Sequence, residues 1–233
     1  MQAIYLVTNW HVVTGLVPST LLPIDANLPK PSVLRLFYKR RANEQRTTVN
    51  TWTLDIKLYD RGNPVWFEHS KRQHVDVVAL KVPVAELGEF ANLPINSIEQ
   101  ESRLKLYVGM DSFVLGFPEG ISGPGKTPIW KRASIASEPD YDFRNVPGFI
   151  VDTATRSGMS GSPVIVRHSG IFKPHEEPQF RGDEILGTVS KFVGIYSGRY
   201  ADDPMGVSLG MVWRSVVLDD ILTGKTKGFS SWN

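Results

Sequence analysis

The stretch Gly158-Met159-Ser160-Gly161-Ser162-Pro163 puts a serine in a glycine-rich turn. The residues that follow, Val164–Val166, are β-branched, so the turn leads into a strand and not into a helix. Glycine has no Cβ, and it therefore adopts the tight backbone conformations that direct main-chain amides to one side. Taken alone, Ser160 would be an ordinary turn residue. Its chemistry depends on two segments far upstream.

These two segments supply a histidine and an aspartate. His11 follows an apolar, strand-like run within Thr8–Val13 (TNWHVV), and Asp76 stands at the start of the apolar stretch Val75–Lys81 (VDVVALK). A serine hydroxyl is a poor nucleophile until an imidazole removes its proton, and the imidazole needs a carboxylate that fixes its tautomer. We therefore predict His11, Asp76 and Ser160 as catalytic residues. The amides of Gly158 and Ser160 are predicted to form an oxyanion hole.

Most of the remaining chain has the pattern of short strands between turns. One segment, 215–223, has apolar residues at helical spacing, and Gly224 follows where a helix would end. This predicts an all-β fold with one C-terminal helix. Long loops are expected over 119–128 and 167–183, and strands over 33–38, 47–59, 75–82, 104–108, 113–116, 129–136, 149–151, 163–166, 185–197 and 206–212.

Composition excludes several classes of protein. The 233 residues are 41% hydrophobic, which is enough for a core and argues against disorder. The absence of cysteine excludes disulfides, thiolate metal sites and a thiol nucleophile. A net charge of +2 and the short apolar runs give no reason to expect nucleic acid or a membrane as a partner. We expect a protein or peptide substrate, no metal and no cofactor, and the oligomeric state stays open.

The N-terminal segment has neither the basic region nor the small-residue cleavage site of a signal peptide. If Met1 is the natural start, a cytoplasmic location is therefore expected.

Two other motifs compete with this interpretation. His74 lies two residues before Asp76, but that spacing in a strand holds the two side chains parallel and about 6.7 Å apart, a poor geometry for a hydrogen bond. Gly120–Thr127 (GISGPGKT) fits the phosphate-binding loop pattern, which requires a helix to begin at its lysine. Pro128 and a strand-like run follow instead, so we expect a Gly/Pro loop.

The three segments with His11, Asp76 and Ser160 resemble the trypsin-like serine protease superfamily, and most of all its bacterial HtrA-type catalytic domains. Two further motifs agree with that resemblance, Leu115–Pro118 (LGFP) and Gly194–Gly198 (GIYSG). The resemblance extends over about residues 3–222. It implies two six-stranded antiparallel β-barrels, the first in 1–100 with His11 and Asp76, the second in 101–213 with Ser160, and a C-terminal helix and tail in 214–233.

Only ten residues precede His11, so the first barrel is expected to lack its N-terminal strands. The resemblance also implies that Ser197 lies near Asp76 and that its strand, with Gly198, binds the substrate backbone. Ala154 would form the floor of the specificity pocket and Gly206 and Ser208 its wall. None of these residues is acidic, which favours cleavage after small or aliphatic residues. A trypsin-fold protein that binds peptides or partners without cutting them is the alternative.

Overall fold

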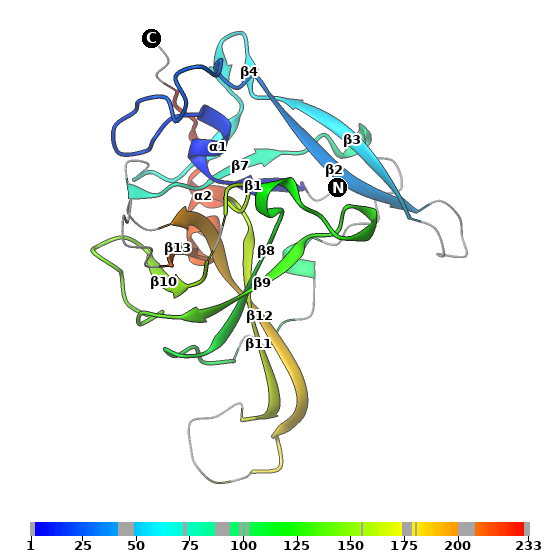
Figure 1. The fold of residues 1–233 in the computed structure, drawn as a ribbon, viewed down its shortest axis with the longest axis vertical. Helices are drawn as coiled ribbons and strands as arrows, with labels where there is room; N and C mark the ends of the chain where they lie inside the picture. The colour runs from blue at the N-terminus through cyan, green and yellow to red at the C-terminus, as the bar shows by residue number, and fades with distance from the viewer. Residues whose placement is uncertain are drawn as a thin grey trace. The chain divides into compact units, whose positions relative to one another are not determined.

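The computed structural model describes residues 3–41, 49–71, 74–86, 94–97, 100, 103–154, 156–173, 179, 181–199 and 208–230. The chain forms two compact units (Figure 1). The first unit comprises 1–94, 122–127 and 216–233, and the second unit comprises 95–121 and 128–215. The C-terminal helix and tail thus belong to the same unit as the N-terminal segment.

The second unit is a closed antiparallel barrel of six strands. Their order around the ring is β10-β13-β12-β11-β8-β9. The strands are β8 (Asp111–Gly116), β9 (Ile129–Ile135), β10 (Gly148–Asp152), β11 (Pro163–Phe172), β12 (Ile185–Arg199) and β13 (Leu209–Arg214). This ring confirms the all-β prediction for this part of the chain.

The barrel core follows from the alternation of side chains along each strand. Val164 and Val166 on β11 are fully buried, whereas Arg167 is exposed. Larger side chains fill the space between the strands, among them Phe149, Tyr196 and Met159, all with 0% exposure. Met159 lies directly before Ser160, so the predicted serine turn is attached to the core.

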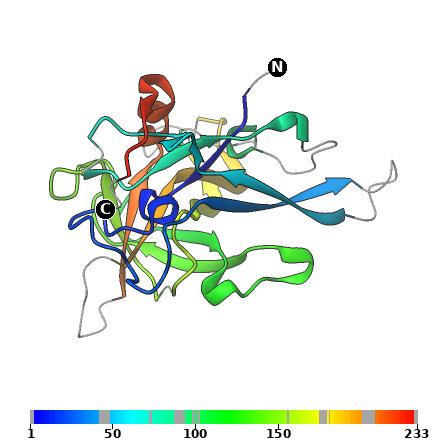
Figure 2. The ribbon, with the colours of Figure 1, turned by 90° about the horizontal axis from the view of Figure 1, so that it is seen from above.

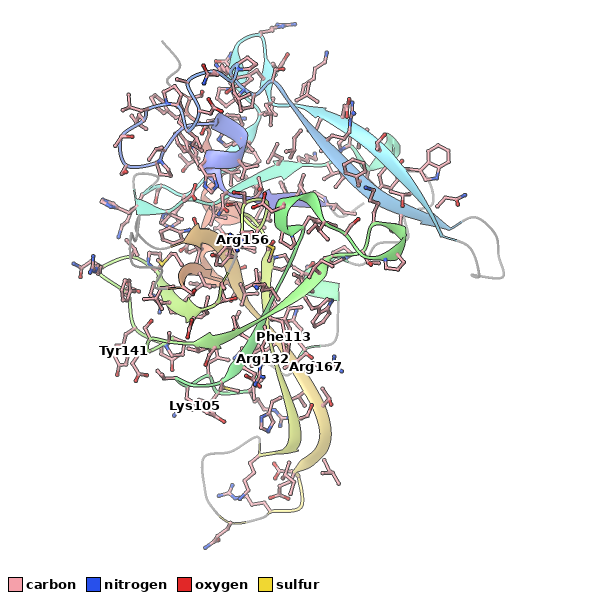
Figure 3. All side chains as sticks on the ribbon, in the orientation of Figure 1. Lys105, Phe113, Arg132, Tyr141, Arg156 and Arg167 are labelled. Atoms are coloured by element: carbon pink, nitrogen blue, oxygen red, sulfur yellow. The ribbon has the colours of Figure 1, made fainter. Side chains whose placement is uncertain are left out.

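The β11–β12 hairpin differs from the prediction. The 167–183 segment was expected to be a loop, but β11 continues to Phe172, which pairs with Ile185 of β12. Glycines and polar residues interrupt the alternation of apolar and polar side chains that would predict a strand here. The segment is nevertheless extended, because its main chain pairs with β12. Phe113, Arg132 and Arg167 lie near the point where the hairpin leaves the barrel (Figure 3). The predicted strand 104–108 is also wrong, because this segment is irregular and ends in a turn.

The first unit contains a four-stranded sheet and two hairpins. The sheet has the order β1-β7-β6-β14, and the two hairpins are β2–β3 and β4–β5. The long β2–β3 hairpin is the pair of blue strands in Figure 2. The bounds are β1 (Tyr5–Thr8), β2 (Val33–Arg41), β3 (Val49–Lys57), β4 (Tyr59–Asp60), β5 (Asn63–Pro64), β6 (Trp66–Glu68), β7 (Val78–Lys81) and β14 (Thr226–Lys227). The described residues of this unit do not close into a ring, and the sequence had predicted a barrel here that lacks its N-terminal strands.

Strand β14 comes from the far end of the chain and lies beside β6. The residues after β14 also contact β6, since the N–H of Gly228 donates to the Trp66 carbonyl at 3.0 Å. The next residue, Phe229, donates its N–H to the buried Glu68 carboxylate at 3.0 Å. A C-terminal segment therefore supplies the fourth strand of the sheet, which the sequence analysis did not foresee.

The described residues contain two α-helices, α1 (Trp10–Thr14) and α2 (Val216–Gly224). The second confirms the predicted C-terminal helix, and it packs on β6 and β7 with Val217 and Ile221 buried. Short 3₁₀ turns are η2 (Val84–Glu86), η3 (Ile95–Ser97), η4 (Pro118–Gly120) and η5 (Pro124–Lys126). Within the described ranges, no helix is both long and apolar enough to span a membrane.

Candidate active site

His11 is held by the short helix α1, which the sequence analysis missed. Trp10 and Val13 on this helix are 1% and 0% exposed and fix its position in the core. The helix ends at Gly15, whose φ of 71° is left-handed and whose N–H donates to the His11 carbonyl at 2.8 Å. Trp10 and Val13 face the core, whereas the imidazole of His11 is only partly buried.

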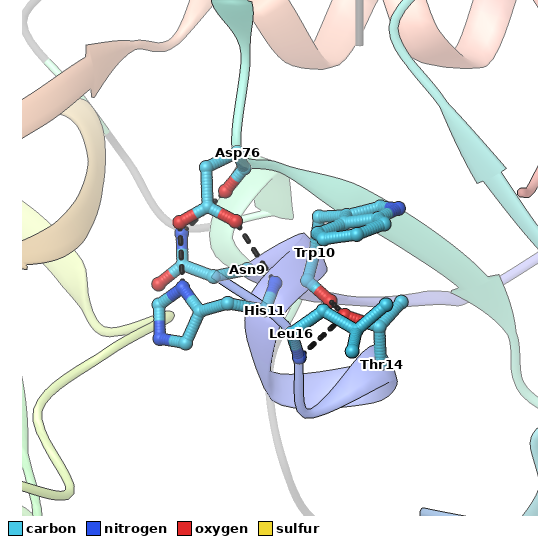
Figure 4. Close-up of polar contacts among 6 residues, drawn as sticks. All are labelled: Asn9, Trp10, His11, Thr14, Leu16 and Asp76. Atoms are coloured by element: carbon cyan, nitrogen blue, oxygen red, sulfur yellow. Dashed lines mark hydrogen bonds and ion pairs between the residues drawn. The ribbon is translucent and has the colours of Figure 1, made fainter. Parts of the chain in front are cut away.

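Asp76 binds His11 through both of its carboxylate oxygens (Figure 4). Oδ2 lies 2.6 Å from Nδ1 of the imidazole, and Oδ1 accepts the backbone N–H of His11 at 2.9 Å. A carboxylate only accepts hydrogen bonds, so Nδ1 carries the ring proton. In the neutral form of the ring, the other nitrogen, Nε2, then has a free lone pair and can accept a proton.

Asn9 fixes the main chain of Asp76, a role that the sequence analysis did not assign. Its amide Nδ2 donates to the Asp76 carbonyl at 2.6 Å, and Asn9 is completely buried. An asparagine directly before a helix usually caps that helix with its side-chain oxygen, but Asn9 makes no such bond. The sequence does place an asparagine two residues before the histidine, but the preference of asparagine for helix N-caps predicts a capping role for it.

The serine turn of the second unit is fixed on both sides of Ser160. Before it, Met159 is buried in the barrel core. After it, Gly161 donates to the Tyr196 carbonyl at 2.9 Å, and Ser162 donates back to the Met159 carbonyl at 3.1 Å. The half-buried Ser160 therefore lies in a turn whose ends are held by the barrel.

Gly158 and Gly116 are required by the close approach of the serine turn to the LGFP segment. Gly158 has a left-handed φ of +87°, and a Cβ there would lie 2.5 Å from the Phe117 carbonyl oxygen. A Cβ on Gly116 would lie 2.2 Å from Oγ of Ser162. In addition, the N–H of Glu119 donates to the Ser157 carbonyl at 2.8 Å. The LGFP segment is thus the support against which the serine turn packs.

The predicted substrate-binding residues of the second unit fall in two places. Gly198, at a bulge in β12, has a φ of +112°, and a Cβ on it would lie 3.8 Å from Oγ of Ser160. Ser197, also on β12, is half-buried. Ala154 is exposed, and its neighbour Thr153 donates to the Ser208 carbonyl at 2.6 Å. Gly206 lies outside the described residues.

Two other histidines lie near Asp76 in the sequence, the competing His74 and also His69. His74 is exposed, and its N–H donates to the Lys71 carbonyl at 2.9 Å. His69 is buried, with Nε2 3.4 Å from Oδ2 of Asp220 on α2. In the part of the chain that the structure covers, no group of three or more His, Asp or Glu side chains could hold a metal ion.

In the segment with the phosphate-loop pattern, no α-helix begins at the lysine. The lysine ends a 3₁₀ turn, Pro124–Lys126, and β9 begins shortly after it, at Ile129. The main-chain amides and helix dipole that bind a phosphate in such loops are therefore not supplied here. The segment is the Gly/Pro loop that the sequence predicted.

Residues 2–170 match the sequence profile of the trypsin-like peptidase domain, and this range includes His11, Asp76 and Ser160. The chain belongs to this family. A comparison with curated protein sequences found no significant match to the chain.

Solved structures similar to this peptidase domain have low sequence identity to it. Human heparin binding protein is 14% identical, with 96% of this chain and 82% of that chain covered and a TM-score of 0.46. The active form of the Rv3671c protease from M. tuberculosis is 16% identical, with 87% and 84% covered and a TM-score of 0.40. The HtrA-type protease AlgW, with a tripeptide, is 11% identical, with 83% and 60% covered and a TM-score of 0.41.

Proposed function

We propose that this trypsin-like peptidase domain is a serine endopeptidase in which His11, Asp76 and Ser160 form the catalytic triad. The observation that carries the proposal is the pair of bonds between His11 and Asp76, 2.9 Å and 2.6 Å long. They hold the imidazole in the tautomer that a general base requires, with Nε2 unprotonated. The family match supports the same reaction class.

In the proposed mechanism Oγ of Ser160 attacks the carbonyl carbon of the scissile peptide bond, and its proton moves to Nε2 of His11. The oxyanion of the tetrahedral intermediate is bound by the amides of Gly158 and Ser160, a contribution of roughly 10²–10³ in rate per donor. The C–N bond then breaks, and the leaving amine takes the proton from His11. Water, deprotonated by the same imidazole, hydrolyses the acyl-enzyme and restores Ser160.

Substrate preference is proposed from the small side chains assigned to the specificity pocket. Ala154, Gly206 and Ser208 carry no charge, so none of these positions offers a carboxylate that would pair with lysine or arginine. We expect cleavage after small or aliphatic residues, with the substrate backbone along Ser197 and Gly198. A peptide panel cut mainly after arginine would contradict this preference.

The nucleophile is tested with a fluorophosphonate probe, which reacts only with an activated serine. Labelling is expected for the wild type and lost in Ser160→Ala and His11→Ala. Ser157→Ala is the matched control, because Ser157 is an exposed serine of the same turn whose carbonyl, not its hydroxyl, is bonded. It should be labelled like the wild type. A folded wild type that is not labelled would favour the alternative, a trypsin-fold binding protein.

A further inference from the structure

The second unit carries a pocket on the outer side of its barrel, where the β11–β12 hairpin begins. The pocket has a volume of about 540 Å³, and its walls include Tyr107, Asp111, Phe113, Arg132, Arg167 and His168. Figure 3 shows Phe113, Arg132 and Arg167 close together at this place. None of these residues has a role in the proposed peptidase mechanism.

Positive charge is in excess in this pocket, since two arginines face one aspartate. Arg132 donates from Nε and Nη2 to the carboxylate of Asp111 at 2.8 to 3.0 Å. Arg167 is exposed, and within the described residues its guanidinium makes no hydrogen bond or ion pair. Asp111 is thus already bound by Arg132, and the guanidinium of Arg167 is left for an external anion. An arginine in this state pairs best with a carboxylate or phosphate, through two parallel hydrogen bonds.

The same wall of the pocket is an open strand edge. β11 pairs with β12 over its whole length but with β8 only at Val164, Ile165 and Val166. From Arg167 to Phe172, within the described residues, no strand lies on the β8 side of β11. In an antiparallel hairpin every second residue directs its N–H and C=O away from its partner, so this edge offers unpaired main-chain groups. Arg167, His168 and Ser169 of this edge line the pocket.

We propose that the pocket binds an extended acidic segment of another protein, which adds as a strand to the free edge of β11 between Arg167 and Phe172. The main-chain groups of the edge would hold the peptide backbone, as in other cases of strand addition. A carboxylate of the peptide would pair with Arg167. Phe113 pairs with Ile165, two residues before Arg167, so it lies on the same outer face of the sheet as Arg167. Together with Tyr107, which is 55% exposed, it offers apolar surface to the peptide beside that arginine.

The choice of a peptide over a small anion rests on two features that occur together. The arginine alone would serve any anion, but only a polypeptide can pair with a strand edge. Alternation in an extended chain puts every second side chain on one face. A segment that alternates acidic and apolar residues therefore presents all of its carboxylates to the face of the sheet that carries Arg132 and Arg167.

Binding is tested by fluorescence anisotropy with a fluorescein-labelled peptide of ten residues that alternates glutamate and valine. The full chain with Ser160→Ala is used, so that the probe stays intact and the result does not depend on peptidase activity. Arg167→Gln should weaken binding by about tenfold or more, the loss expected for one charge-assisted pair. Arg144→Gln removes an exposed arginine of the same unit that does not line the pocket, and it should change binding less than about twofold.

Strand addition is separated from simple charge attraction by N-methylation of the probe. One version is methylated on every valine nitrogen and the other on every glutamate nitrogen, so that each blocks one edge of the peptide. We expect one of the two to bind much more weakly and the other to bind like the parent, because only one edge faces β11. Equal binding of both methylated probes to the parent would overturn the proposal. So would equal binding by Arg167→Gln and Arg144→Gln, or by a probe with glutamine in place of glutamate.

Discussion

Nδ1 of His11 lies 2.6 Å from Oδ2 of Asp76, although 65 residues separate the two in the chain. The other oxygen of the same carboxylate accepts the backbone N–H of His11 at 2.9 Å. One side chain therefore fixes both the ring and the main chain of the histidine. Rotation of the imidazole would break only the bond to Nδ1. The bond from the His11 backbone N–H to Asp76 would remain, so helix α1 would stay attached to the aspartate.

The first prediction concerns the tautomer of His11. Asp76→Asn keeps an oxygen that can accept the backbone N–H, but its amide can present an N–H to Nδ1 and so favour the wrong tautomer. We expect kcat to fall by roughly 10⁴-fold, with little loss of stability. Steady-state kinetics on the best substrate of a peptide panel, together with thermal unfolding, would measure both. A loss of less than tenfold would mean that Asp76 does not orient the base.

Asn9→Ala tests whether the buried amide positions Asp76. Without the Nδ2 donor, the Asp76 carbonyl loses its 2.6 Å bond inside the protein, which should cost about 1–3 kcal/mol of stability. Activity should fall through kcat more than through KM, because the carboxylate shifts relative to the imidazole. Asn27→Ala, at an exposed asparagine, is the control and should behave like the wild type. An unchanged kcat in Asn9→Ala would contradict a positioning role.

Gly158→Ala tests the support of the serine turn. Its φ of +87° and the 2.5 Å approach to the Phe117 carbonyl both oppose a side chain. Gly182 has a φ of +86° with open space around it, so Gly182→Ala measures the backbone strain alone, about 1–2 kcal/mol. Chemical denaturation should show a larger loss for Gly158→Ala, and fluorophosphonate labelling should be lost only there. Equal losses in the two variants would show that the turn does not depend on this contact.

Gly228→Ala tests the docking of the C-terminal strand. A Cβ at this position would lie 2.3 Å from Nε1 of Trp66, a side chain that is completely buried and has no room to move. We expect destabilisation of about 1–3 kcal/mol, typical of an overpacked core. Gly187→Ala, in the β11–β12 hairpin and with nothing within 4 Å, should cost less. Hydrogen exchange at the amides of Gly228 and Phe229 would report whether the tail has detached.

The Arg35–Asp55 pair on the β2–β3 hairpin predicts a pH dependence. The hydrogen bonds from Arg35, with Nε 2.7 Å from Oδ1, hold the pKa of Asp55 below its usual value. A lowered carboxyl pKa adds stability above the unfolded pKa, roughly 3.9, and this stability is lost as the pH falls through the folded pKa. NMR titration should show a higher pKa for Asp55 in Arg35→Gln. Lys39→Gln, on the same hairpin, should leave the Asp55 titration nearly unchanged.

Local patterns in the sequence were enough to predict much of this protein. Helix α2 and the strands of the second unit, apart from the extended end of β11, follow from side-chain periodicity, which depends only on near neighbours in the chain. The Ser160 turn could be predicted for the same reason, since Gly158 and Gly161 act on the backbone beside them. His11 and Asp76 were paired from chemistry, because an imidazole base needs a carboxylate, and the structure brings these two together.

Contacts between segments that are distant in the chain could not be predicted from local sequence patterns. Asn9 turns from its own helix to the Asp76 carbonyl, and no local rule distinguishes that use from capping. The strand Thr226–Lys227 is only two residues long and carries little apolar pattern, yet it completes the sheet beside β6. The extension of β11 to Phe172 likewise depends on its partner β12. In each case a main-chain or side-chain amide group forms its hydrogen bonds with a segment that is not adjacent in the chain. Which segment that is depends on the tertiary fold and not on the local sequence.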